Sequence, residues 1–114
     1  MEDELYGNIT IAPAVLNTIA RLTTLGVPGV ARMGNSGQLL QSAPGTSIKV
    51  DNGKVKADVY VILHADCNFY ATGQQIQHEV TRAISEIVGM DVQAINVHVQ
   101  DVEYSQPEPP DPVS

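Results

Sequence analysis

The chain has 114 residues, a length that fits one domain with a real hydrophobic core. Its single cysteine excludes an internal disulfide framework and a paired-cysteine zinc site, and no apolar run approaches the ~18 residues of a membrane-spanning helix. The net charge of -7 comes from the two ends, because acidic and basic residues balance between positions 5 and 100. The few basic residues are scattered, so the sequence lacks the basic footprint of a nucleic-acid-binding protein.

The acidic start of the chain also bears on where the protein works. No apolar stretch of signal-peptide type follows it, which argues against a secretory signal and predicts a cytoplasmic protein without a direct membrane span. The formally neutral body does not oppose self-association electrostatically, so we expect copies of the chain to associate.

The first part of the chain is predicted to hold a strand, a helix and a short apolar piece. Residues 8–11 alternate polar and apolar side chains, which predicts a short strand. Residues 13–25 have a proline at the first helical position and apolar side chains at helical spacing, and Gly26 is placed to end this helix as a left-handed cap. The apolar piece 30–33 then leads into the glycine-rich loop 34–45.

The second part is predicted to contain three strands and a helix. Residues 46–50 and 54–64 read as strands joined by a tight Asp-Asn-Gly turn, the stripe of apolar residues over 71–88 predicts a helix ended by Gly89, and 92–102 read as the last strand. The face of strand 54–64 that we expect in the core consists of Val55, Ala57, Val59, Val61 and Leu63. Its other face, expected to be mostly exposed, consists of Lys54, Lys56, Asp58, Tyr60, Ile62 and His64. In the last strand, the inward side chains are Ile95, Val97 and Val99, and the outward ones are Asn96, His98 and Gln100.

This order of elements, β-α-β-β-β-α-β, predicts an α/β (α+β) two-layer sandwich with a mixed sheet and two helices on one face. The other face of the sheet is expected to stay exposed and polar. The domain is predicted to span residues 7–104, between an acidic N-terminal extension, 1–6, and an acidic, proline-rich disordered tail, 105–114.

The densest group of reactive residue types is His64, Asp66 and Cys67. A thiolate beside an imidazole can act as a nucleophile, and the three histidines, with His78 and His98, could in principle gather around zinc. The histidine spacings match no ligand motif, and structural roles are favoured for all of these residues. His64 and His98 could lie side by side on the exposed face. The loop start, 34–37, resembles a phosphate cradle but lacks the lysine of a P-loop. We therefore expect no catalytic site, no metal and no cofactor.

Several segments, in this order, resemble the alkaline shock protein 23 (general stress protein 24) family of bacteria, also called envelope stress response proteins. The resemblance covers roughly residues 7–103, and the closing run Ile95–Val102 is its most specific part. The other matching segments are Gly7–Val15, Ile19–Ala20, Val27–Ala31, Ile48–Val50, Gly53, Val55–Leu63, Gln77–Val80 and Ile87–Met90.

The resemblance implies a non-enzymatic protein of envelope stress response and cell-envelope homeostasis. It implies an interaction or scaffold module that self-associates and is recruited to the cytoplasmic membrane by a membrane-anchored protein partner. Two alternatives stay open: a soluble regulator of lipid-precursor metabolism that acts through protein or small-molecule binding, and a Cys/His enzyme or metal protein. The predicted interaction surface comprises Tyr60, His64, Asn96, His98 and Gln100. Gly29 and Gly89 are predicted to supply backbone geometry at helix–strand junctions.

Overall fold

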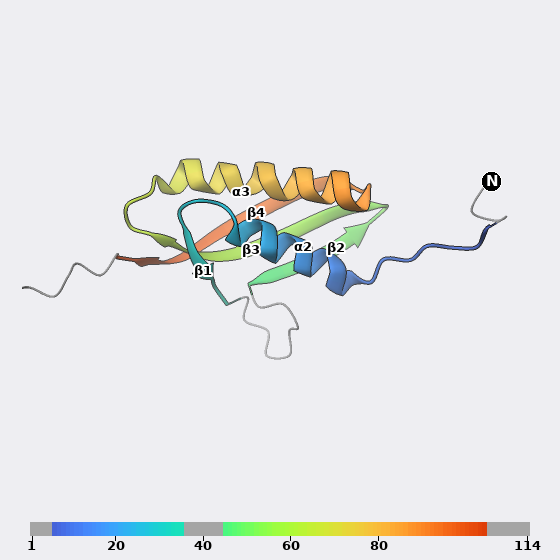
Figure 1. The fold of residues 1–114 in the computed structure, drawn as a ribbon, viewed down its shortest axis with the longest axis horizontal. Helices are drawn as coiled ribbons and strands as arrows, with labels where there is room; N and C mark the ends of the chain where they lie inside the picture. Colours follow the sequence, from blue (N-terminus) through green and yellow to red (C-terminus); the bar gives the residue numbers. More distant parts are fainter. Residues whose placement is uncertain (1–5, 36–44, 105–114) are drawn as a thin grey trace, which may run out of the picture.

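The computed structural model describes residues 6–35 and 45–104 (Figure 1). The predicted tail 105–114, residues 1–5 of the predicted extension and residues 36–44 of the predicted loop lie outside the described part of the chain. The elements are α2 (Pro13–Leu25), β1 (Val30–Met33), β2 (Thr46–Asp51), β3 (Lys54–His64), α3 (Phe69–Ala83), the π-helix η1 (Ile84–Val88) and β4 (Asp91–Glu103).

The four strands form one mixed sheet with β3 at its centre. β4 runs parallel to β3 along its whole length, whereas β1 and β2 lie antiparallel on the other side of β3, one after the other. Between them, the amide of Gly34 donates to the carbonyl of Tyr60 at 2.6 Å, and the amide of Tyr60 donates to the carbonyl of Gly45 at 2.8 Å. β1 and β2 therefore form one edge strand that is interrupted opposite Tyr60.

Both helices cover the same face of this sheet. α2 packs over β1 and β2, and α3 packs over β4 and against α2 (Figure 1). The core between the layers includes the fully buried face of β3 that the alternation predicted: Val55, Ala57, Val59, Val61 and Leu63. From the helices, Leu16, Ala20, Ile76, Val80 and Ile84 complete it. Burying one such side chain contributes roughly 1.5–3 kcal/mol, so the two-layer fold follows from the hydrophobic pattern.

The structure overturns the prediction of a strand over residues 8–11. Residues 7–12 run as an extended segment away from the body and pair with no strand among the described residues (Figure 1). Ile9 is 89% exposed and Ile11 is 45% exposed. Alternation gives a segment its strand propensity, but a strand forms only where a neighbouring strand accepts its backbone hydrogen bonds.

Two helix ends also differ from prediction. Gly26 closes α2 in a right-handed conformation with φ of -80°, not as a left-handed cap. α3 begins two residues earlier than predicted, because the side chain of Asn68 accepts a hydrogen bond from the amide of Ala71 at 2.8 Å. Its last turn widens into η1, where the amide of Gly89 donates to the carbonyl of Ile84, five residues back, at 3.1 Å.

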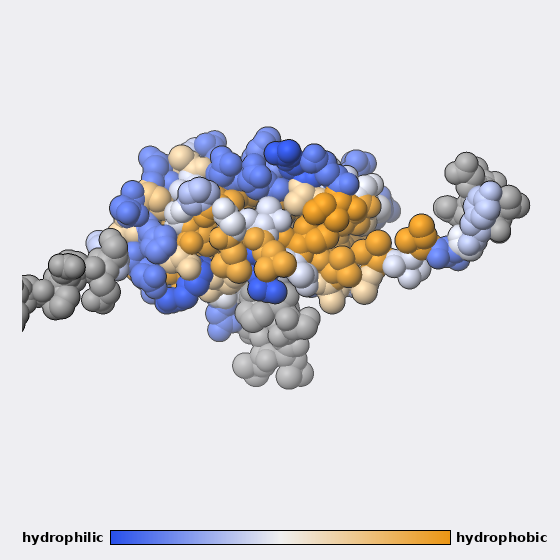
Figure 2. All heavy atoms as spheres, in the orientation of Figure 1, coloured by the Kyte–Doolittle hydropathy of each residue, from blue (hydrophilic) through white to orange (hydrophobic). Residues whose placement is uncertain are grey.

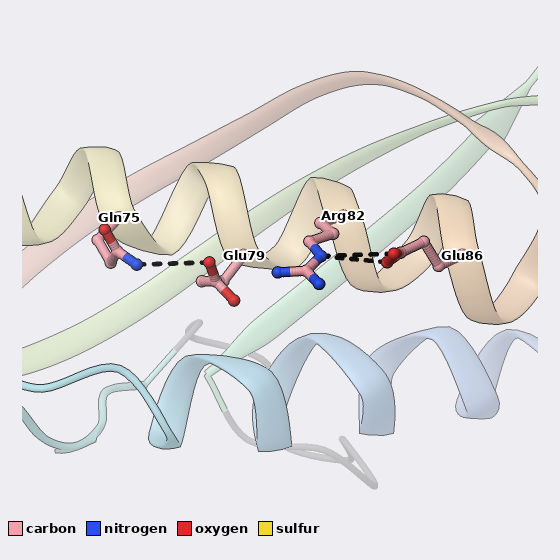
Figure 3. Close-up of polar contacts among 4 residues, drawn as sticks. All are labelled: Gln75, Glu79, Arg82 and Glu86. Atoms are coloured by element: carbon pink, nitrogen blue, oxygen red, sulfur yellow. Dashed lines mark hydrogen bonds and ion pairs between the residues drawn. The ribbon is translucent and has the colours of Figure 1, made fainter.

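Polar side chains pair along the flank of α3 and η1 that runs beside α2 (Figure 3). The amide of Gln75 donates to Glu79 at 3.4 Å, and Arg82 lies 3.1 Å from the carboxylate of Glu86. Both pairs have the four-residue spacing that stabilises a helix surface by about 0.2–0.5 kcal/mol. This flank is therefore polar, in contrast to the apolar, orange surface over α2 in Figure 2.

Candidate functional site

The candidate site is the sheet face opposite the helices, which we call the open face. No element among the described residues covers it, and its side chains are partly or fully exposed. The strand registers place the following side chains on it: Arg32, Ser47, Lys49, Lys54, Lys56, Asp58, Tyr60, Ile62, His64, Asn96, His98 and Glu103.

A hydrogen-bonded cluster lies at the middle of the open face, where β3 and β4 run side by side. The register sets Asp58 opposite Asn96 and Tyr60 opposite His98. Asp58 Oδ1 accepts hydrogen bonds from Asn96 Nδ2 at 3.2 Å and from His98 Nε2 at 2.9 Å. Because a carboxylate only accepts, Nε2 carries the proton in this contact. We call these four residues the Asp58 cluster.

The aromatic part of the cluster is a stacked pair. The rings of Tyr60 and His98 have centroids 4.5 Å apart and an interplanar angle of 15°. The imidazole is thus fixed twice, by Asp58 at one ring edge and by the tyrosine at its face. Cross-strand pairs contribute roughly 0.2–1 kcal/mol each, so the stacking and the hydrogen bonds together favour this arrangement of the side chains.

The cluster also changes the acid–base chemistry of its carboxylate. The hydrogen bond from His98 is the largest effect that lowers the pKa of Asp58, and the hydrogen bond from Asn96 acts in the same direction. Both stabilise the ionised form of the carboxylate. Asp58 therefore stays negatively charged at neutral pH, with two fixed donors around it.

Two further contacts cross the sheet beyond this cluster. Arg32 Nη1 lies 2.8 Å from Glu103 Oε1 and joins β1 to β4, with both side chains about half exposed. Gln100 sits at a bulge, because Val99 and Asp101 oppose consecutive residues of β3. Its amide group bonds the backbone of Asn35. These contacts tie the two edges of the sheet together over β3.

The His64, Asp66 and Cys67 group does not assemble into a reactive centre. Cys67 packs against the core, with its thiol 3.8 Å from the carbonyl of Gly29. His64 lies on the open face, since the residue before it on β3, Leu63, is buried on the helix side. Within the described ranges, no three side chains of His, Cys, Asp or Glu come together as metal ligands do.

The structure brings together three of the five residues predicted for the interaction surface: Tyr60, Asn96 and His98. His64 is not beside His98, as the sequence had suggested, because His98 opposes Tyr60 and His64 opposes Glu103. Gln100 does not join the cluster either, because it lies at the bulge and its side chain bonds the backbone of Asn35. Sequence reasoning placed Asp58 on the exposed face but missed it as the centre of the cluster.

The Asp58–His98 pair has the residue types of a catalytic dyad, so the position of a nucleophile beside it matters. An Asp–His pair supports nucleophilic catalysis only when a nucleophile lies at the free edge of the imidazole. Here the neighbouring hydroxyl-bearing residue, Tyr60, stacks on the face of the ring instead. Fixed donors, acceptors and an aromatic surface are what a protein interface uses at its centre.

Comparison with known proteins decides the family. The alkaline shock protein 23 family, described as having a cell envelope-related function, matches residues 1–104. The chain belongs to this family. The resemblance seen in the sequence is thereby confirmed, and the open face is a surface of an alkaline shock protein 23 domain. No helix within the described residues is long and apolar enough to cross a membrane.

The relatives of this alkaline shock protein 23 family member are bacterial. Spy1535 of Streptococcus pyogenes serotype M6 is 28% identical over 117 residues, covering 97% of this chain and 91% of its own. YqhY of Bacillus subtilis is 25% identical over 111 residues, covering 90% and 82%. YloU of the same organism is 20% identical over 112 residues, covering 90% and 93%.

Solved structures confirm the fold class. MamM-CTD 215-293 superposes with a TM-score of 0.53 at 11% identity, and the match covers 79% of this chain and 99% of that one. A second chain, MamM-CTD H264A, gives a TM-score of 0.52 at 12% identity, with 83% and 100% covered. At this identity the likeness concerns the fold alone.

Proposed function

We propose that this chain is a non-enzymatic interaction module of cell-envelope homeostasis, which binds a membrane-anchored partner protein through its open face. It would work from the cytoplasm and be held at the membrane by that partner. The observation that carries the proposal is the Asp58 cluster, in which fixed polar groups and a stacked aromatic pair lie on an uncovered part of the sheet. The cell envelope-related function of the family supports the setting.

The charges of the open face favour a protein partner. Lys54 and Lys56 lie at one end of β3, Arg32 and Glu103 pair at the other, and Asp58 stands between them. Anionic lipids or nucleic acids attract a surface of one positive sign. The open face carries positive and negative side chains around an aromatic centre, which suits a partner protein with complementary charges. In protein interfaces, charge complementarity sets specificity, and buried aromatic side chains contribute much of the affinity.

The test is a cross-linked pull-down from native cells, with soluble and membrane fractions read by mass spectrometry. The variant Tyr60→Ala/His98→Ala removes the stacked pair. His78→Ala is the matched control, because His78 is an exposed histidine on α3, in the other layer. We expect an integral membrane protein to be captured by the unmodified chain and by the control, and to be lost with the double variant.

Two results would contradict the proposal. Capture that is unchanged in the double variant would show that the partner binds elsewhere. Capture of soluble metabolic enzymes in place of a membrane protein would favour the alternative, a regulator of lipid-precursor metabolism.

A further inference from the structure

A second surface, separate from the open face, lies where α3 meets the outer edge of β4. It is a groove of roughly 430 Å³. Phe69, Tyr70 and Gly73 form its α3 side, and Val97 and Val99 form its strand side. Tyr70 is 78% exposed, and a Cβ on Gly73 would meet no atom within 4 Å. Gln74 and Gln77 also line the groove, which is therefore mainly apolar rather than wholly so. It is open, and part of its floor is a residue without a side chain.

The edge of β4 beside this groove has free hydrogen-bonding capacity. Among the described strands β4 pairs only with β3. The carbonyl of Ile95 points to the outer side, where the amide of Gln77 donates to it at 3.1 Å. Since peptide groups two residues apart face the same way, those of Val97 and Val99 also point outward, beyond the reach of this contact.

The edge also lacks the charges that usually protect exposed strands. No Lys, Arg, Asp or Glu occurs between Val92 and Gln100. The opposite edge of the sheet, by contrast, carries Lys49 and Asp51 on β2. Edge strands commonly use such charges to prevent pairing with another chain. The middle of β4 is therefore the edge better suited to accept a strand.

The chain itself contains a segment with the features of the missing strand. Residues 8–11 alternate polar and apolar side chains and run extended, with Ile9 and Ile11 exposed and no strand beside them among the described residues. Like the groove, the segment carries no charged side chain. Ile9 and Ile11 are two residues apart, as are Val97 and Val99, so the two apolar pairs can lie next to each other across a strand pair.

We propose that residues 8–11 of one copy of the chain add as a strand to the β4 edge of a second copy, with Ile9 and Ile11 seated in the groove. The acceptor is a second copy because α2, which follows the segment, lies over β1 and β2 with α3 between it and the β4 edge. A stable dimer needs about 1,200–2,000 Å² of buried surface, more than a single short strand provides. Reciprocal exchange doubles the contact and keeps two-fold symmetry.

The test measures the mass of the full chain in solution by analytical ultracentrifugation over a range of concentrations. Ile9→Asp/Ile11→Asp alters the donor segment, and Gly73→Leu fills the acceptor groove. Leu22→Asp is the matched control: Leu22 is 56% exposed on α2, away from the β4 edge. We expect the unmodified chain and the Leu22→Asp control to be dimers. At the same concentrations, we expect the Ile9→Asp/Ile11→Asp and Gly73→Leu variants to be monomers.

Circular dichroism shows whether each variant is folded, which is expected because the substituted positions are exposed or open. The proposal is overturned if the unmodified chain stays monomeric, or if either altered surface leaves the dimer intact. It is also overturned if Leu22→Asp abolishes the dimer, since α2 would then form the interface. None of these results bears on the partner of the open face, which the pull-down tests separately.

Discussion

Gln100 on β4 holds the backbone of Asn35 with both ends of its side-chain amide. Oε1 accepts from the amide of Asn35 at 2.7 Å, and Nε2 donates to the carbonyl of Asn35 at 2.7 Å. A Cβ on residue 34 would collide with Gln100 Oε1, so Gly34 leaves the space that this contact occupies. One side chain thus ties the end of the β1 edge to the strand on the opposite side of β3.

Replacing this side chain should loosen the segment that it holds. We expect Gln100→Ala to cost about 1 kcal/mol of unfolding free energy, the usual net contribution of such hydrogen bonds, and to speed amide exchange at Asn35. Gln100→Glu keeps the acceptor and loses the donor, so its effect should be intermediate. Urea unfolding and hydrogen exchange followed by NMR measure both quantities. Unchanged exchange at Asn35 in Gln100→Ala would show that the contact does not restrain the backbone.

The Asp58 cluster should make a small contribution to stability that depends on pH. Because folding lowers the pKa of Asp58, the ionised carboxylate stabilises the folded state above its ordinary pKa of about 3.9. This contribution is lost as the pH falls through the lower pKa of the folded state. Asp58→Asn should therefore be less stable than the unmodified chain at pH 7, by less than about 1 kcal/mol because the site is solvated.

Urea unfolding between pH 7 and pH 2.5 measures this difference. The gap between the unmodified chain and Asp58→Asn should narrow as the pH falls. His98→Ala removes the donor with the largest effect on this pKa, so it should reproduce most of the loss at pH 7. A gap that stays constant down to the lowest pH would mean that the charge of Asp58 does not stabilise the fold.

Two glycines with positive φ should differ in how well they tolerate alanine. Gly89 has a φ of 77° and open space where a methyl group would project, so Gly89→Ala should cost only the conformational energy, about 1–2 kcal/mol. Gly29 has a φ of 101°, and a Cβ there would lie 3.1 Å from both Cys67 Cβ and Thr72 Oγ1. Gly29→Ala should therefore cost more than Gly89→Ala. Thermal unfolding of the two variants side by side checks the order, and equal costs would show that Cys67 and Thr72 move aside freely.

Gly73 offers the opposite case, a glycine whose replacement should stabilise the protein. It lies inside α3, has no positive φ, and a Cβ there meets nothing within 4 Å. Gly73→Ala should raise the unfolding free energy by about 0.5–1 kcal/mol through helix propensity. Denaturant unfolding at low protein concentration, where dissociation precedes unfolding, isolates this effect. If Gly73→Ala lowered the unfolding free energy instead, the prediction that this position has room for a methyl group would be wrong.

The sequence predicted the bounds of β3 and the start of α2 because both carry strong local signals. β3 alternates over eleven residues, and its apolar face is buried against the helices. The start of α2 follows from a proline, which suits a first helical position. Residues 8–11 also alternate but form no strand in the structure, because alternation does not show whether a neighbouring strand is present to pair with.

The site was harder to predict. The alternation along a strand indicates which face of the sheet a side chain lies on, but it does not indicate which residue of the next strand lies opposite. Asp58, Asn96 and His98 were correctly placed on the exposed face, but only the register of β3 against β4 brings them together. The extra residue at Gln100, of which the sequence carries no sign, shifts the register only beyond Val61, so that His64 opposes Glu103. His64 and His98 therefore share a face while opposing partners at different points along the sheet.

The interruption of the edge strand opposite Tyr60 has a consequence for how the sequence can vary. Gly34 and Gly45 bond to the same residue, so the chain leaves the sheet and re-enters it at one point. β1 and β2 each have their own register with β3, and the length of the intervening segment sets neither. Lengthening a loop costs only about 0.6 kcal/mol per doubling. We therefore expect that a peptide epitope inserted between residues 35 and 45 would leave the registers of β1 and β2 with β3 unchanged.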